Sequence, residues 1–195
     1  RMAKMLIPLL EKQKYLNKVE IFSNQKIHLN LDIFREMPIN ISFNLSNIYE
    51  VLTGVKFNLN KPVLNVDKTP GFENKIIISR TKRYRNQFLD YSFLKSYENK
   101  IFLGLEEEFN DLKKIIPNIE FYECKDFLEM AKIINTCKIF IGNQSFGFAL
   151  AESLKVKRLL ELYPELPNVL PSTDNSYICM HQIQFENFFK ELIKN

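Results

Sequence analysis

The chain has 195 residues, with no tryptophan, only five glycines, three cysteines and two histidines. It carries neither a Gly-x-Gly-x-x-Gly fingerprint nor a phosphate loop ending in Gly-Lys-Ser/Thr, which argues against a dinucleotide-dependent dehydrogenase. The cysteines are odd in number and share no metal-ligand spacing, so they favour a reducing compartment. The histidines, His28 and His181, lie far apart and neither belongs to a recognisable catalytic triad.

Long apolar runs and strong charge are also missing. No apolar stretch reaches the length of a membrane span, and the first residues lack the small-residue cleavage site of a signal peptide. The net charge of +4 would help to hold an anionic ligand but is far from the dense basic surface of a nucleic-acid binder. We therefore expect a cytoplasmic protein without nucleic-acid partners, with peripheral membrane contact left open. Because the chain begins at Arg1 instead of Met, we expect a fragment truncated at its N-terminus.

Two parts follow from the patterning. Helical patterns at 2–16 and 45–52 and short strand patterns at 18–22 and 26–31 predict a partial N-terminal α/β domain over residues 1–60. Residues 61–74, rich in Pro and Asn, are predicted to be a linker. Strand patterns then recur at 75–79, 100–104, 119–123, 137–141 and 158–161, with helical patterns at 90–97, 106–116, 126–136 and 145–155 between them. This alternation predicts a Rossmann-like, doubly wound parallel sheet over residues 75–178.

The stretch IFIGNQSFGFALAESL, residues 139–154, is the most informative motif. It reads as a buried strand, a turn at Gly142 and Asn143, and a helix that opens near Ser145. A strand that leads into a helix presents free backbone N–H groups and a partial positive charge at one point, which suits phosphate. Gly147 would let a ligand approach the backbone. The alternative is a purely structural unit, because most strand–turn–helix units in α/β domains bind nothing.

A basic segment, SRTKRYRNQ at residues 79–87, follows the first strand of this sheet. Ligands of open α/β sheets bind outside the carboxyl ends of the strands, so the loops at 79–86, 104–106, 123–126 and 142–146 are expected to share one edge. Arg80 and Arg83 are the stronger candidates for diphosphate contacts, which arginine can make bidentately. The alternative is a solvated basic face, particularly for Lys82 and Arg85.

Residues 139–154 resemble the donor-binding segment of GT-B glycosyltransferases, where two acidic residues flank seven others around a Gly-Phe-Gly-like helix start. Gln144, then SFGFALA, then Glu152 keeps this spacing, with Gln in place of the first acid. The wider pattern, CKIFIGNQSFGFALAESLKVKRLLELYPELPNVL, is similar to the heptosyltransferase-type, family nine-like glycosyltransferases, of which the chain looks like a divergent relative.

The resemblance implies that residues 75–178 form the C-terminal, nucleotide-sugar-binding domain of a GT-B fold. It also implies that the helix in residues 179–195 packs back on the N-terminal domain. The expected activity is metal-independent transfer of a sugar, without a cofactor, from a nucleotide-sugar donor to a glycan or lipid-linked acceptor in polysaccharide biosynthesis. The expected donor-binding residues are Arg80, Arg83, Gly142, Asn143, Gln144, Ser145, Phe146, Gly147 and Glu152, with Glu152 on the ribose hydroxyls.

Some roles stay open. In the resembling family the loop near Tyr122, Glu123 and Phe127 lies near the nucleobase, so these residues are further candidates. No catalytic base is assigned, because the first domain is short. The alternatives are a non-catalytic nucleotide-sugar-binding relative and a sugar-nucleotide epimerase of related fold.

Overall fold

The computed structural model describes residues 2–36 and 44–194, and within them a six-stranded sheet has the strand order β3-β2-β1-β4-β5-β6. The strands are β1 Ile76–Ser79, β2 Lys100–Phe102, β3 Ile119–Phe121, β4 Ile139–Asn143, β5 Arg158–Glu161 and β6 Ser176–Cys179. All neighbouring strands pair in parallel. The chain builds outward from β1 to β3 and then returns to place β4 beside β1, so the order reverses between β1 and β4. This confirms the predicted Rossmann-like, doubly wound sheet.

The central strands are apolar without alternation. Every residue of β1 and β4 is buried, and Ile77 lies opposite Phe140 in the register that places Ser79 beside Gly142. A strand that is apolar at consecutive positions can be stable in water only if both faces of its sheet are covered. The sequence of β1 and β4 therefore requires helices on both sides.

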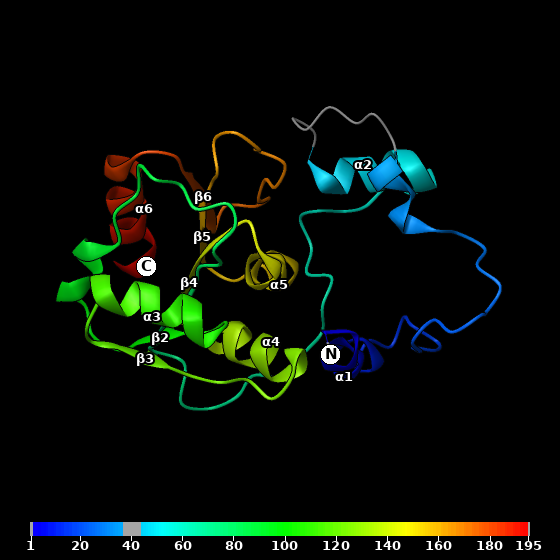
Figure 1. Ribbon diagram of the computed structural model, residues 1–195, viewed down its shortest axis with the longest axis horizontal. Helices are drawn as coiled ribbons and strands as arrows, with labels where there is room; N and C mark the ends of the chain where they lie inside the picture. Colours follow the sequence, from blue (N-terminus) through cyan, green and yellow to red (C-terminus); the bar gives the residue numbers. More distant parts are fainter. Residues whose placement is uncertain (1, 37–43, 195) are drawn as a thin grey trace.

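Helices cover both faces, as Figure 1 shows. One core cluster joins β1 and β4 to α1 Met2–Glu11, α4 Phe127–Thr136 and α5 Phe146–Leu154. The other joins the opposite face to the 3-10 helix η2 Ser92–Ser96, α3 Glu106–Ile115 and α6 Gln182–Lys194. Ile77 and Ile78, adjacent in β1, belong to different clusters because successive side chains of a strand point to opposite faces. Residues 90–97, predicted to be α-helical, form only the short η2.

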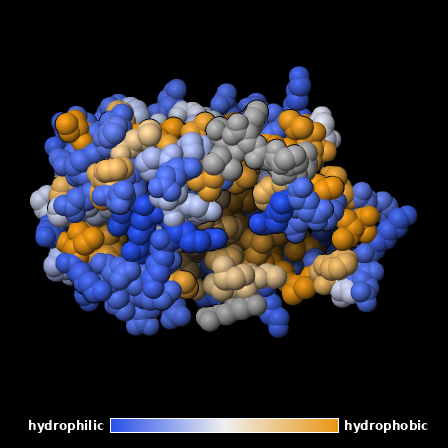
Figure 2. Space-filling view, turned by 45° about the horizontal axis from the view of Figure 1, so that its top comes forward, coloured by the Kyte–Doolittle hydropathy of each residue, from blue (hydrophilic) through white to orange (hydrophobic). Residues whose placement is uncertain are grey.

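The N-terminal part contradicts two predictions. Residues 18–22 and 26–31 form no strand, and the 3-10 helix η1 Leu31–Glu36 and α2 Leu45–Thr53 follow them. A strand pattern needs a neighbouring strand to satisfy its backbone, and none lies beside these residues within the described chain. Apolar side chains remain exposed there, and Figure 2 shows apolar residues on the surface of one face of the molecule. Residues 37–43 of the predicted first domain lie outside the described residues.

Two elements of the N-terminal part behave differently from this exposed segment. Helix α2 is confirmed, with Asn44 as N-cap and Gly54 as left-handed C-cap at φ 68°. Helix α1 packs on α4, and its Leu9 is buried in the same cluster as Val66 of the predicted linker. The first helix and part of the linker thus contribute to the core of the sheet, while the division into domains at residues 60 and 75 stays a prediction.

The C-terminal end brings a further correction. Strand β6 was not predicted, because Ser176–Cys179 is short and follows a proline-rich segment. Helix α6 packs on β5 and β6, and its expected return to the N-terminal domain stays a prediction. Its buried Phe185 and Phe189 meet Phe93 of η2 edge to face, with ring centroids 5.0 and 5.6 Å apart. The apolar face of α6 is therefore already occupied by the sheet and η2.

Candidate functional site

A cavity of about 480 Å³ lies at the carboxyl edge of the sheet. Its lining includes Ser79 and Thr81 at the end of β1, Gly104 after β2, Cys124 after β3 and Ser145 after β4. The predicted sharing of one edge by these loops is confirmed. The cavity lies at the reversal of strand order between β1 and β4, where open α/β sheets bind ligands.

Apolar walls close the cavity on the side of α1 and α4. They are formed by Met2 and Met5 of α1 and by Phe127 and Met130 of α4, and Phe146 of α5 packs on Phe127 with ring centroids 4.3 Å apart. The sequence did not reveal the contribution of α1. Its helical period predicts a helix, but only the packing of α1 on α4 brings Met2 and Met5 to this edge.

The start of α5 is the most unusual feature of the cavity. Ser145 is its N-cap residue, yet its side chain makes no capping hydrogen bond. The buried Ser145 Oγ has no hydrogen-bond partner among residues 2–36 and 44–194. A buried polar atom without a partner costs about 1–3 kcal/mol. The first N–H groups of the helix also lack intrahelical partners, so this end of α5 has spare donors, and Ser145, Phe146 and Gly147 line the cavity.

Gly142 of β4 and Gly147 of α5 serve the close packing of the backbone. A Cβ on Gly147 would lie 2.7 Å from Ser79 Oγ, and one on Gly142 would lie 2.8 Å from the Ser79 carbonyl oxygen. Only glycine lets the start of α5 approach β1 this closely. The expected role of Gly147 in ligand approach stays a prediction, although its position in the cavity lining agrees with it.

Four basic residues follow β1, and three of them have carboxylate partners. Arg80 pairs with Glu161 at 2.7 Å, Lys82 with Glu107 at 2.8 Å and Arg85 with Asp111 at 3.1 Å. Within the part of the chain that the structure describes, Arg83 pairs with no carboxylate. It is exposed, lines the cavity, and has its guanidinium 5.7 Å from the centroid of the Tyr84 ring. Arg83 is therefore the cation most available to an anion.

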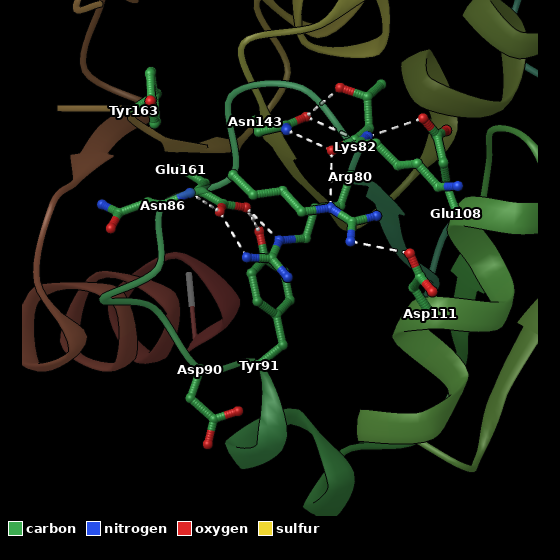
Figure 3. Close-up of polar contacts among 12 residues, drawn as sticks. Arg80, Lys82, Asn86, Asp90, Tyr91, Glu108, Asp111, Asn143, Glu161 and Tyr163 are labelled. Atoms are coloured by element: carbon green, nitrogen blue, oxygen red, sulfur yellow. Dashed lines mark hydrogen bonds and ion pairs between the residues drawn. The ribbon is translucent and has the colours of Figure 1, made fainter. Parts of the chain in front are cut away.

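Arg80 belongs to a buried network shown in Figure 3. Its Nε and Nη2 donate to the two oxygens of Glu161, which is fully buried and also accepts from Asn86 N at 2.6 Å and Tyr91 Oη at 2.8 Å. Burial and the neighbouring carboxylate hold the pKa of Tyr91 well above its usual value, so the phenol stays a donor. Arg80 does not line the cavity, and the network fixes the loop after β1 to β5.

Asn143 and Gln144 are both bonded internally. Asn143 Oδ1 accepts from Thr81 N at 3.0 Å, and its Nδ2 donates to Arg83 O at 2.6 Å. Gln144 Nε2 donates to Leu166 O at 2.6 Å, while its Oε1 accepts from Tyr163 N at 2.7 Å. Their amide groups thus hold two loops in place, and their expected donor contacts gain no support from this geometry.

Glu152 lies at the other end of α5, away from the cavity lining. Its carboxylate accepts from Lys155 Nζ, from Arg158 Nε at 2.6 Å and from Ser172 Oγ at 2.8 Å. Arg158 is itself fully buried, and burial lowers its pKa despite the carboxylate. The carboxylate that opposes the helix dipole is therefore compensated by two cations of the same chain, and its expected contact with ribose stays an untested prediction.

Two further polar side chains line the cavity on the β3 side. Glu123 is exposed and has no ion-pair partner in the described ranges, and Cys124, the next residue, lines the same cavity. Burial raises the pKa of Cys124 to about 12, so this thiol is not an activated nucleophile. The described residues bring no three His, Cys, Asp or Glu side chains together as metal ligands. No helix within them is long and apolar enough to cross a membrane.

Neither a protein-family model nor a curated sequence matches the chain. The fold is similar to E. coli ADP-heptose lps heptosyltransferase II, with 13% identity, a TM-score of 0.47, and 63% of this chain and 47% of that chain covered. It is also similar to E. coli heptosyltransferase WaaC with ADP-2-deoxy-2-fluoro heptose, with 13% identity, a TM-score of 0.48, and 75% of this chain and 54% of that chain covered. A third similar structure is the glycosyl transferase family 9 from Veillonella parvula DSM 2008, with 12% identity, a TM-score of 0.44, and 76% of this chain and 42% of that chain covered.

These three structures are of the kind that the sequence resembles, and the chain spans about half of their length. At such identities and scores no residue role is carried over from them. The roles of the residues at the carboxyl edge therefore depend on the geometry of this chain.

Proposed function

We propose that the chain is a glycosyltransferase of GT-B type, or its donor-binding part, and that it binds the diphosphate of a nucleotide-sugar at the start of α5. The observation that carries the proposal is the buried, unpartnered Oγ of Ser145, the N-cap residue of α5, which is one of the residues that line the cavity. Such an atom gains a partner when an anion with several acceptor oxygens enters the cavity.

The lining suits the rest of such a ligand. Arg83 supplies a positive charge beside the helix N-terminus, while Phe127 and Met130 offer an apolar wall for a planar base. The carboxylate of Glu123 can accept hydrogen bonds from hydroxyl or amino groups. A volume of about 480 Å³ lies in the usual range of small-molecule sites.

The chemistry follows from the same groups. When a sugar leaves its nucleotide, negative charge develops on the departing diphosphate. The spare N–H groups of α5, the Ser145 hydroxyl and Arg83 would stabilise that charge without a metal ion. A glycan or a lipid-linked sugar is the proposed acceptor, and no side chain of the described residues is assigned as its base.

The test compares Arg83→Gln with Lys82→Gln. Both remove one positive charge from the same loop, but Lys82 is already paired with Glu107. Losing a charged hydrogen bond should cost Arg83→Gln about 1.5–3 kcal/mol of affinity for nucleoside diphosphates, measured by calorimetry with ADP, UDP and GDP. Lys82→Gln should bind nearly as the parent does.

Binding by the parent chain should weaken with salt, because charge supplies part of it. Equal losses of affinity in both variants would mean that only the net charge of the loop matters, and would contradict the specific role of Arg83. A folded parent chain that binds none of the three diphosphates at millimolar concentration would overturn the proposed function itself.

A non-catalytic nucleotide-sugar-binding protein is the second candidate. Four of the residues expected to contact the donor are held by partners within the chain: Arg80, Asn143, Gln144 and Glu152. A protein that has lost transfer can still keep a diphosphate site at α5. Binding of a nucleotide-sugar without release of the nucleoside diphosphate, in the presence of mixed glycan and lipid-linked acceptors, would favour this alternative.

A further inference from the structure

Two tyrosines meet beside the proposed diphosphate site. The rings of Tyr84 and Tyr163 have centroids 5.9 Å apart at an interplanar angle of 50°, and both side chains are half-buried. The guanidinium of Arg83 lies 5.7 Å from the centroid of the Tyr84 ring. The aromatic pair is thus connected to the cavity through Arg83, although neither ring lines the cavity.

The backbone of Tyr84 is unusual. It has φ 58°, in the left-handed region that residues with a bulky side chain rarely adopt. Such a conformation persists only when the surroundings determine it, and it often marks a functional site. Here Asn143 Nδ2 donates to Arg83 O at 2.6 Å, and Arg85 Nε donates to Thr81 O at 3.0 Å. These bonds hold the loop on both sides of Tyr84.

Tyr163 is held by Gln144, the residue that follows Asn143 in the chain. Its backbone N–H donates to Gln144 Oε1 at 2.7 Å, and its hydroxyl donates to Glu165 Oε2 at 2.6 Å. Asn143 and Gln144, adjacent in the chain, therefore hold the backbone next to Tyr84 and at Tyr163. The turn that leads into α5 organises this pair as well as the start of the helix.

We propose that Tyr84 and Tyr163 form a subsite for the sugar ring of a nucleotide-sugar whose diphosphate lies at Arg83 and Ser145. The proposal rests on the proposed function and extends it to the group beyond the diphosphate. Aromatic rings present a negative face that attracts the slightly positive C–H groups of a pyranose. Glu165, beside the Tyr163 hydroxyl, supplies a carboxylate that accepts hydrogen bonds from sugar hydroxyls.

The experiment measures how much the sugar adds to binding. Calorimetry with the full chain compares ADP with ADP-glucose, UDP with UDP-glucose and GDP with GDP-mannose, and the ratio of the two affinities isolates the contribution of the sugar. Tyr163→Leu keeps an apolar side chain but removes the ring, so it should lower this ratio about three- to tenfold, the size of one aromatic contact. Tyr163→Phe keeps the ring and should keep the ratio within about twofold.

Tyr177 provides a matched control. Its hydroxyl also bonds a glutamate, Glu191, and its ring stacks on Phe188 with centroids 4.2 Å apart, but Tyr177 lies in β6 and both partners lie in α6. Tyr177→Leu should leave the ratio unchanged, and circular dichroism should show each variant to be folded. Diphosphate binding with a ratio that Tyr163→Leu does not change would overturn the subsite alone. Failure of the parent chain to bind any of the six compounds would overturn the proposed function, and the subsite with it.

Discussion

The two ends of α5 differ in what they leave unpaired. At its start, Ser145 Oγ has no partner among the described residues and Arg83 stands beside the cavity without a carboxylate. At its end, Glu152 accepts from two cations and from Ser172. Both ends belong to one motif in the sequence. The comparison supports the proposed diphosphate site at the end of α5 where polar groups have no partner among the described residues.

The difference also explains a carboxylate in an unfavourable position. A negative charge near the C-terminus of a helix opposes the macrodipole. In this chain Lys155, which is the C-cap of α5 at φ 57°, and the buried Arg158 neutralise it. A ligand is therefore not needed to account for Glu152.

The largest expected effect is at Glu152. Glu152→Ala leaves the buried Arg158 without its carboxylate, so it should lower the free energy of unfolding by about 3–5 kcal/mol, measured by urea denaturation. Glu186→Ala removes the exposed ion pair with Lys190 and should change the free energy of unfolding by less than about 1 kcal/mol. A stable Glu152→Ala protein with weakened nucleotide-sugar affinity would instead support contact with ribose and break the contrast between the two ends.

Gly147 tests the close packing at the start of α5. Gly147→Ala would normally stabilise a helix, by about 1 kcal/mol. Here the added methyl group meets Ser79 Oγ at 2.7 Å, and overpacking of this kind costs about 1–3 kcal/mol. We therefore expect a lower melting temperature, partly restored in the double variant Gly147→Ala with Ser79→Ala. A more stable single variant would show that α5 can move away from β1.

The smallest and sharpest effect is expected at Ser145. Replacing an N-cap serine by alanine usually costs about 1 kcal/mol. Because the Ser145 side chain makes no capping bond, Ser145→Ala should leave the free energy of unfolding unchanged or raise it slightly. The same change should weaken nucleoside diphosphate binding by about 0.5–1.5 kcal/mol. Thermal unfolding and calorimetry on the same protein separate the two readouts. A destabilised variant with parental affinity would assign the hydroxyl to the fold.

Local pattern was sufficient for much of the sheet. Residues 139–154 predicted a strand, a turn and a helix, and β4, Ser145 as N-cap and α5 confirm the strand and the helix. The turn predicted at Gly142 and Asn143 is wrong, because both residues pair with β5 as the end of β4. The strand patterns at 18–22 and 26–31 were equally local but gave no strand. A strand needs a neighbour to bond with, and the sequence does not show whether one is present.

The sequence alone determined the alternation of strands and helices, and with it the parallel, doubly wound sheet and the edge at which its loops meet. Which polar side chains remain available was decided only by the tertiary structure. Arg80 and Arg83 look equivalent in the sequence, yet Glu161, distant in the chain, accepts from one and leaves the other beside the cavity. Period and spacing are local properties, whereas the pairing of a charge depends on segments that folding brings together.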